Sequence, residues 1–352
     1  MKKTTDRRHF LKTTLLGGLG AMGAARWARL GLAEESPAKF TSRVVLSAGD
    51  DRADIAFRSL KPLADDVARA IGERCIIIKP NNVSIKTQLA ATHADTLAGI
   101  FEFLKSIGKL GQAVVAESAA EGPTMEGFDN YNYPKVAAKY GVKLVDLDQE
   151  PVEIVHLFDE KDFRPHAVRM SRTLLDPRNY LISAARMKTH DRVMATLSLK
   201  NIVFGAPIKD RGSRWGKNSA PGAKCDKPIA HGSGFRAINF NIFQIAQRTH
   251  PHLAVIDGFE GMEGEGPIGG TPVDHRVCVA GTDWLAADRV GIELMGIDFA
   301  KVGYLNYCGQ AGMGETDLNR IEVVGEPIVG HVKTYKLAKN VEQQLVWMKP
   351  PA

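Results

Sequence analysis

The sequence predicts an α/β protein with a mostly parallel sheet flanked by helices, arranged as two α/β lobes with a cleft between them. Two observations lead to this prediction. Short apolar runs, typical of strands buried on both faces, alternate with segments that carry apolar residues at helical spacing. The chain of 352 residues is 44% hydrophobic and 24% charged, which supplies enough apolar material for such cores. Strands and helices that alternate in this way form parallel sheets with right-handed crossovers.

The first predicted lobe covers residues 43–160. Its helices should end at glycines, because Gly72 and Gly108 follow the last apolar residues of two periodic segments. Strands are expected at 43–47, 75–78, 113–116 and 142–145, and helices at 53–71, 94–107 and 132–140.

The second predicted lobe covers residues 161–330 and should carry most of the site. The boundary is placed near 150–165, where the pattern becomes rich in strands. Strands are expected at 152–157, 167–170, 180–185, 253–256, 276–280 and 321–324, and helices at 236–249 and 283–295. A long polar loop over 209–236 is of the kind that is usually functional or mobile. Residues 331–352 form a C-terminal tail.

Residues 1–33 resemble a twin-arginine export signal. Arg7 and Arg8 precede a polar residue, Phe10 and Leu11, and the weakly apolar run that follows is too short to span a bilayer. Small residues up to Ala33 then fit a signal peptidase site. The alternative is a disordered basic tail. We expect a periplasmic or otherwise exported protein that uses the twin-arginine translocase and a signal peptidase, with a linker at 34–42 and no stable membrane anchor after cleavage.

The net charge of +6 comes from the first 33 residues. They contain seven of the 46 basic and one of the 40 acidic side chains, so 39 of each remain. A neutral body does not favour nucleic acid or anionic membranes as partners.

The four cysteines lie far apart, and no C-x-x-C pair occurs. No iron–sulfur cluster is therefore expected. Cys75 and Cys278 lie in apolar runs and are predicted to be core thiols. Cys225 and Cys308 lie in predicted loops, and the sequence leaves open whether they form a disulfide.

Cationic and hydroxyl side chains gather in residues 186–206. Lys188 and His190 follow an apolar strand, at the sheet edge where α/β proteins bind ligands. Thr196 and Lys200 share a face whether the next segment is a strand or a helix. A buried lysine requires a partner, so we expect either an anionic ligand or a structural carboxylate. Lys79 similarly closes a strand, although it could simply end that strand in solvent.

An acidic, glycine-rich stretch at 257–270 follows another buried strand. Asp257, Glu263 and their acidic neighbours crowd together, and such crowding is relieved by a cation or a proton. A glutamate of raised pKa or a hard-cation site is the functional hypothesis, and a solvated loop is the alternative. His190 and His231 could join a carboxylate on one metal. The candidate metal ligands are therefore His190, Asp257, Glu263 and His231.

The order of the motifs resembles the family catalogued as domain of unknown function 362. The resemblance runs from about residue 44 to 325, and implies no general reaction. Many members carry an iron–sulfur module, whose cysteines this chain lacks. The motifs are Lys-Pro-Asn at 79–81, Lys-Thr-His at 188–190, Thr-Leu-Ser-Leu-Lys-Asn at 196–201, Asp-Gly at 257–258, Met-Glu-Gly-Glu-Gly-Pro at 262–267 and Ala-Ala-Asp at 286–288.

These features predict an enzyme that acts on a small anionic substrate, with a bound divalent metal as a secondary hypothesis. A periplasmic binding or accessory protein without catalysis is the alternative, and a redox protein comes third. The predicted catalytic residues are His190, Glu263 and Lys188. The predicted substrate-binding residues are Lys79, Asn81, Thr196, Lys200 and Asn201.

Overall fold

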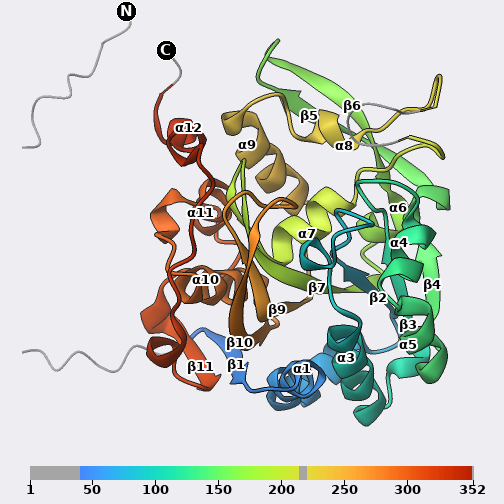
Figure 1. The fold of residues 1–352 in the computed structure, drawn as a ribbon, viewed down its shortest axis with the longest axis vertical. Helices are drawn as coiled ribbons and strands as arrows, with labels where there is room; N and C mark the ends of the chain where they lie inside the picture. The colour runs from blue at the N-terminus through green and yellow to red at the C-terminus, as the bar shows by residue number, and fades with distance from the viewer. Residues whose placement is uncertain (1–39, 214–219, 351–352) are drawn as a thin grey trace, which may run out of the picture. The chain divides into compact units, whose positions relative to one another are not determined.

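A computed structural model describes residues 40–213 and 220–350, so the predicted signal at 1–33 and most of the linker lie outside the described residues. Residues Lys39–Ala352 group as one compact unit. Its centre is a mixed nine-stranded sheet in the order β11–β1–β10–β9–β7–β2–β3–β4, with β8 paired to β7 (Figure 1). The strands are β1 Ser42–Ala48, β2 Cys75–Pro80, β3 Ala113–Glu117, β4 Lys143–Asp146, β7 Asn179–His190, β8 Met194–Thr196, β9 Leu253–Glu263, β10 Thr271–Gly281 and β11 Ile321–Gly325.

Five adjacent strands, from β9 through β7, β2 and β3 to β4, run parallel to their neighbours, which confirms the predicted α/β class. The sheet continues across the predicted boundary between lobes, because β2 pairs directly with β7. The segments expected as strands near 152–157 and 167–170 form a separate hairpin of β5 Val152–Asp159 and β6 Arg164–Ser171.

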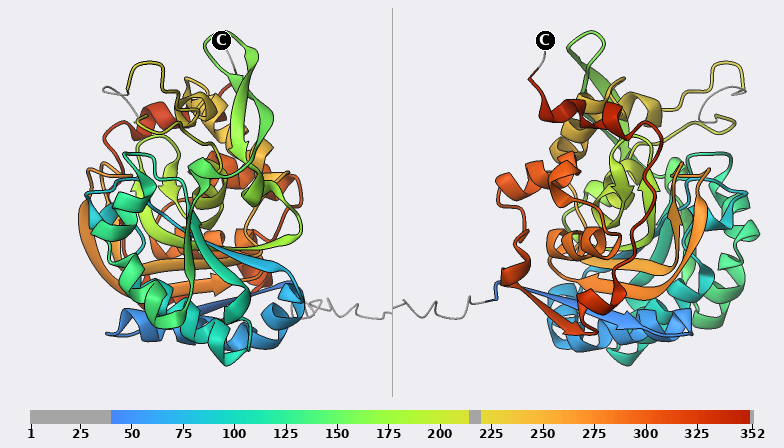
Figure 2. Two further views of the ribbon diagram at one scale, coloured as in Figure 1. Left: turned by 90° about the vertical axis from the view of Figure 1, so that its right-hand side faces the viewer. Right: turned by 60° about the vertical axis from the view of Figure 1, so that its left-hand side comes forward.

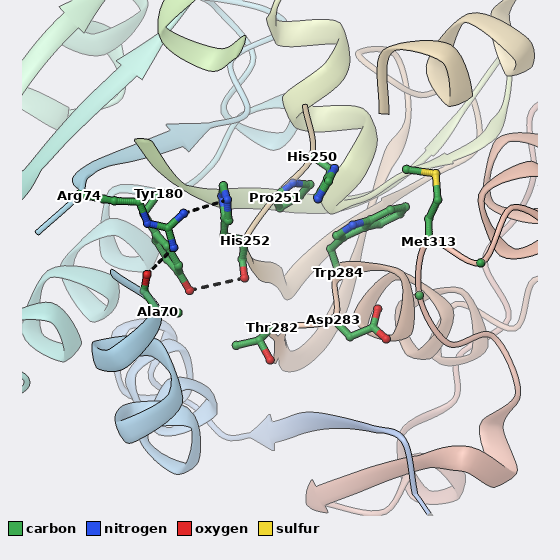
Figure 3. A pocket seen from close by; sticks show the side chains of 12 residues that line it. Ala70, Arg74, Tyr180, His250, Pro251, His252, Thr282, Asp283, Trp284 and Met313 are labelled. Carbon is green, nitrogen blue, oxygen red and sulfur yellow. Dashed lines mark hydrogen bonds between the residues drawn. The ribbon is translucent and has the colours of Figure 1, made fainter. Parts of the chain in front are cut away.

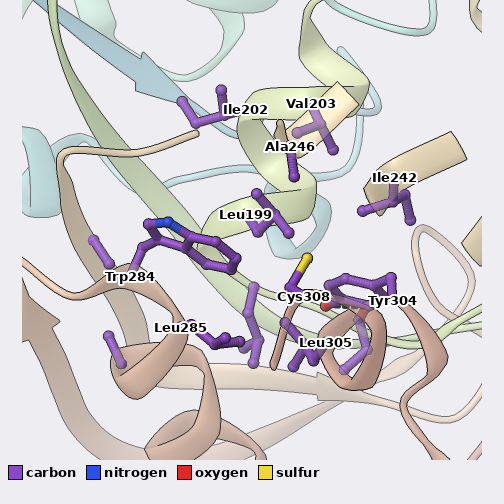
Figure 4. Close-up of a cluster of buried hydrophobic side chains, with 14 of the residues drawn as sticks. Leu199, Ile202, Val203, Ile242, Ala246, Trp284, Leu285, Tyr304, Leu305 and Cys308 are labelled. Carbon is purple, nitrogen blue, oxygen red and sulfur yellow. Dashed lines mark hydrogen bonds between the residues drawn. The ribbon is translucent and has the colours of Figure 1, made fainter. Parts of the chain in front are cut away.

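Helices cover both faces of the sheet (Figure 2). Alternate residues of β2 divide between two apolar cores, since Ile76 and Ile78 contribute to one and Ile77 to the other. The core on the α7 side includes Leu199, Ile202 and Trp284 (Figure 4). The helices are α1 Arg52–Leu60, α2 Ala64–Ile71, α3 Ala94–Ser106, α4 Thr124–Asn130, α5 Tyr133–Tyr140, α6 Arg172–Leu175, α7 Ser198–Gly205, α8 Lys227–Ala230, α9 Phe235–Ala246, α10 Trp284–Leu294, α11 Gly303–Gln310 and α12 Val341–Gln344. None of the described helices is long and apolar enough to cross a membrane.

Several predicted elements have different boundaries in the structure. The helix expected over 53–71 is two helices, separated by a 3-10 turn at Lys61–Leu63, because Pro62 has no N–H to continue the first. β7 extends to His190, so Lys188 lies within the strand. The glycine-rich stretch expected to be a loop is strand β9 as far as Glu263.

The cysteines also differ from the prediction in two respects, one of which is that Cys308 is buried within α11 and does not lie in a loop. Cys278 is buried as expected, but Cys75 is exposed at the start of β2. Cys225 and Cys308 are both free thiols in the structure.

Candidate functional site

The order of the strands creates a switch point between β2 and β7. From β2 the chain continues to β3 and β4 on one side, and then returns to place β7 on the other. In open α/β sheets, ligands bind outside the carboxyl ends of the strands at such a point. Lys79 and Asn81 lie there at the end of β2, and α7 follows β7 and β8.

Helix α7 carries one cationic and one amide side chain of the site, Lys200 and Asn201. Its first two N–H groups, from Ser198 and Leu199, donate to the Asp288 carboxylate at 2.8 and 3.1 Å. Asp288 therefore caps the helix and occupies its N-terminus. The apolar residues Leu199, Ile202 and Val203 of α7 pack in the core, whereas Lys200 and Phe204 of the same helix line a cavity.

A buried network joins β2, β3 and α7. Lys79 is 1% exposed, and its Nζ lies 2.7 Å from Oε1 of Glu117. It also donates to Oδ1 of Asn201 at 3.1 Å, and the Asn201 amide donates to the Lys79 carbonyl at 3.0 Å. Gly205 makes room for this lysine, because a Cβ there would lie 1.7 Å from Lys79 Cε. The possibility that Lys79 simply ends a strand in solvent is therefore wrong.

A cavity of about 510 Å³ lies beside this network. It is lined by His190, Lys200, Lys227, His231 and the loop 265–269, among others. A smaller recess of about 40 Å³ adjoins it, since Lys200, Phe204 and Lys227 line both. The recess brings together the predicted binding residues Lys79, Asn81, Thr196, Lys200 and Asn201.

Three buried lysines at the site have no carboxylate within ion-pair distance among the described residues. Lys188 Nζ donates to the carbonyl oxygens of Ala90 and Pro267, at 2.7 and 3.4 Å. Lys227 Nζ donates to the Pro207 carbonyl at 2.6 Å. Lys200 Nζ lies 5.0 Å from the centre of the Phe204 ring.

Burial changes the protonation of these lysines, because it disfavours a charged amine. It lowers the pKa of Lys200 to about 7 and that of Lys227 to about 8. Burial and the nearby Lys200 hold the pKa of Lys188 well below its usual value. An anion bound beside these amines would favour their protonated forms.

Both histidines of the cavity are neutral. Burial and Lys200 hold the pKa of His190 well below its usual value, and burial lowers that of His231 to about 3. His190 Nδ1 accepts the Arg192 N–H at 3.0 Å, so its proton is on Nε2, and the Asp191 carboxylate 3.2 Å from Nδ1 is not an ionic partner. His231 Nδ1 donates to the Lys227 carbonyl at 2.8 Å, because a carbonyl can only accept.

Two acidic residues predicted for the site have structural partners instead. Asp257 is buried, lies 3.2 Å from Arg186 and accepts from Thr96 at 2.7 Å. Glu263 accepts the Lys336 N–H at 2.9 Å, and it is Glu265 that lines the cavity. The four proposed metal ligands are not brought together, since residues 40–213 and 220–350 contain no group of three His, Cys, Asp or Glu side chains placed to share a metal.

Sequence reasoning missed Glu117, Asn82 and Lys227. The rule that selected Lys79, a polar residue at the end of a buried strand, applies equally to Glu117 at the end of β3. Asn82 is the neighbour of a selected residue. Lys227 lies in a long polar segment and carries no comparable signal.

A second cavity, of about 440 Å³, lies near the amino ends of β7 and β9 (Figure 3). Its side chains contact one another: Arg74 Nη1 lies 3.2 Å from His252 Nε2, and Tyr180 stacks on the same histidine. Among the described residues, no buried polar atom without a hydrogen-bond partner belongs to its lining. It is therefore a weaker candidate than the cavity beside α7.

The profile of a family described as "Domain of unknown function (DUF362)" matches residues 76–293, more than half of the chain. The chain belongs to the DUF362 family. The matched residues run from β2 to α10, so this DUF362 domain includes Lys79, α7 and the Asp288 cap.

One curated relative of this DUF362 protein is the "Thylakoid-associated protein sll1697" of Synechocystis sp. It is 21% identical over 247 residues, which cover 70% of each chain. No solved structure matches the DUF362 chain.

Proposed function

We propose that this DUF362 protein is an enzyme that binds a small anionic substrate in the cavity beside α7. The observation that supports it most is the set of three buried lysines, Lys188, Lys200 and Lys227, that lack a carboxylate partner among the described residues. The two buried carboxylates nearby are already engaged, Glu117 with Lys79 and Asp148 with Lys209. The other acids lining the cavity are half-buried or exposed. A bound anion would supply the missing partner.

The roles follow from the geometry. Lys200 and Lys227 hold the anionic group, and Lys188 adds positive charge from behind. The Nε2–H of neutral His190 stabilises negative charge that develops on the substrate. Lys200, with a pKa of about 7, serves as the general acid at neutral pH.

The binding step is tested by calorimetric titration with inorganic phosphate, acetate and succinate. We expect Lys200→Met and Lys227→Met each to weaken binding at least about tenfold, since each removes a cation from the anion's contact shell. Lys224→Met, an exposed lysine near the same segment, is the matched control and should bind as the wild type does. If all four proteins bind these anions equally, or none binds, the cavity is not an anion site.

Catalysis is tested separately with a defined mixture of phosphate esters and carboxylic acids, followed by ¹H and ³¹P NMR. The wild type should consume at least one component, and His190→Gln should lose turnover while still binding it. If the wild type binds components of the mixture but converts none, the protein is a binding or accessory protein.

We also propose export by the twin-arginine route, on the basis of Arg7, Arg8 and the run that follows them. A fusion of residues 1–35 to a folded reporter should reach the periplasm. The same fusion with Arg7→Lys and Arg8→Lys should stay in the cytoplasm. Export of both fusions would contradict the proposal.

A further inference from the structure

The recess beside Lys200 lies at the carboxyl ends of β2 and β3, against α7. It holds about 40 Å³ and opens next to the larger cavity, because Lys200, Phe204 and Lys227 belong to both linings. A group of two or three heavy atoms fits there while the rest of a ligand occupies the cavity.

Two buried polar atoms of side chains that line the recess have no hydrogen-bond partner among the described residues. They are Oγ1 of Thr196 and Oδ1 of Asn81. The two side chains are 1% and 5% exposed, respectively. Buried polar groups in proteins are nearly always paired, so two orphan atoms in one recess indicate an occupant.

The chemistry of these atoms selects the occupant. The amide oxygen of Asn81 requires a donor, and the Thr196 hydroxyl can donate to or accept from the same group. A carboxylate or fully ionised phosphate only accepts, and would leave the Asn81 oxygen unpaired. An ammonium group only donates, and would be repelled by Lys79 and Lys200. A hydroxyl group both donates and accepts.

The orientation of the Asn81 amide is fixed by its hydrogen bond to Asn201. Asn81 Nδ2 already donates to Oδ1 of Asn201 at 3.1 Å, which leaves its own oxygen facing the recess without a donor.

We propose that this recess binds a hydroxyl group of the substrate, so that the substrate is a small anion carrying a hydroxyl next to its charged group. The inference rests on the proposed function, because the anionic group must lie on Lys200 for the hydroxyl to reach Thr196 and Asn81. It narrows the substrate class from small anions in general to hydroxylated ones.

The test compares ligands that differ by one hydroxyl: glycolate with acetate, malate with succinate, and glycerol 3-phosphate with propyl phosphate. Affinities are measured by calorimetry on the full chain. In at least one pair, we expect the hydroxylated member to bind about tenfold or more tightly than its partner. Thr196→Val keeps the shape of the side chain and removes the hydroxyl, so it should reduce this preference severalfold and leave the affinity of the deoxy member unchanged. Thr271→Val, an exposed substitution at the start of β10, is the control and should retain the full preference.

The outcomes separate the two proposals. If both members of every pair bind equally and Lys200→Met weakens both, the recess holds only water, and the anion site stands without this inference. If the preference exists but is unchanged in Thr196→Val, the hydroxyl is recognised elsewhere and the inference is wrong. If no anion binds, both proposals fail.

Discussion

At the residue scale, the most constrained contact of the site is the ion pair between Lys79 and Glu117. Both side chains are 2% exposed, so each charge depends on the other for compensation. Glu117 also accepts the N–H groups of Asn82 and Ser118, at 3.0 and 2.8 Å. One carboxylate therefore positions a lysine and the backbone that forms the recess.

Glu117→Gln should reduce the free energy of unfolding by about 3–5 kcal/mol, because it leaves the Lys79 charge buried without a counter-ion. Urea denaturation measures this change. Glu322→Gln breaks an exposed pair with Arg43 and should cost no more than about 1 kcal/mol. Equal effects of the two substitutions would show that burial of the Lys79 pair is energetically unimportant.

Anion affinity should depend on pH through the same lysines. Burial lowers the pKa of Lys200 to about 7 and of Lys227 to about 8, so both amines lose protons as the pH rises through this range. Acetate stays ionised throughout, and its affinity should therefore fall between about pH 6 and pH 9. Calorimetry in buffers of different ionisation enthalpy should detect proton uptake on binding at about pH 8, and Lys200→Met should take up less. Affinity that is constant or rises with pH would contradict the lowered pKa values.

The sequence located most of these side chains but not their partners. Lys79, Lys200 and Asn201 could be selected because polar residues stood out at the ends of apolar runs. The same pattern predicts Glu263 as a site residue, yet its carboxylate accepts the backbone N–H of Lys336. The sequence around Glu263 does not indicate that its carboxylate accepts a hydrogen bond from a backbone amide more than seventy residues away.

At the element scale, α7 depends on a residue that ordinary helix propensity disfavours. Gly205 is the last residue of the helix, and the Lys79 side chain crosses it so closely that a Cβ would lie 1.7 Å from Cε. From helix propensity alone, replacing a helical glycine by Ala should stabilise the protein by about 1 kcal/mol. The packing of Lys79 on Gly205 predicts that this substitution destabilises the protein instead.

Gly205→Ala should lower the free energy of unfolding by about 1–3 kcal/mol, because Lys79 must move away from Glu117 and Asn201. It should also weaken acetate binding, and both changes can be measured on the same preparation by denaturation and calorimetry. Gly111→Ala is the control: its Cβ would meet nothing within 4 Å, so the effect should be within about 0.5 kcal/mol. A stabilised Gly205→Ala protein would overturn the packing argument.

Helices and strands were predictable where the apolar periodicity was strong. The prediction failed where glycine serves close packing and does not turn the chain. The glycines between Asp257 and Glu263 predict a loop, but this run belongs to strand β9. A Cβ at Gly261 would lie 2.0 Å from the Tyr335 hydroxyl, and one at Gly258 would lie 2.9 Å from Val277. These glycines permit close packing, which local sequence does not distinguish from a turn.

At the scale of the whole molecule, the C-terminal segment holds two walls of the cavity. Gly264 donates to the Lys336 carbonyl at 2.7 Å, and Glu265 accepts the Lys339 N–H at 2.9 Å. Asn340 donates to the Asp191 carbonyl at 2.8 Å. Residues 336–344 lie beyond the matched DUF362 region, so residues that line the cavity are held by a part of the chain outside that region.

Gln344→Ala should destabilise the protein by about 1–3 kcal/mol, because Gln344 accepts the buried Met194 N–H at 2.7 Å and its loss leaves that donor unpaired. Amide hydrogen exchange in residues 191–196 should accelerate. Gln343→Ala, an exposed neighbour in α12, should change neither quantity. Equal exchange in the two variants would mean that the segment does not hold this wall.

The first strand of the sheet has consequences for how the protein is made. β1 leaves the ribosome early, yet its partners are β10 and β11, so Val44 must wait for Gly281 and Val323 to be synthesised. Pairings this distant in sequence form slowly, and the unpaired apolar strand is prone to aggregation meanwhile. Synthesis that stops before residue 271 leaves a nascent chain with an open sheet edge, which chaperones must shield until translation ends.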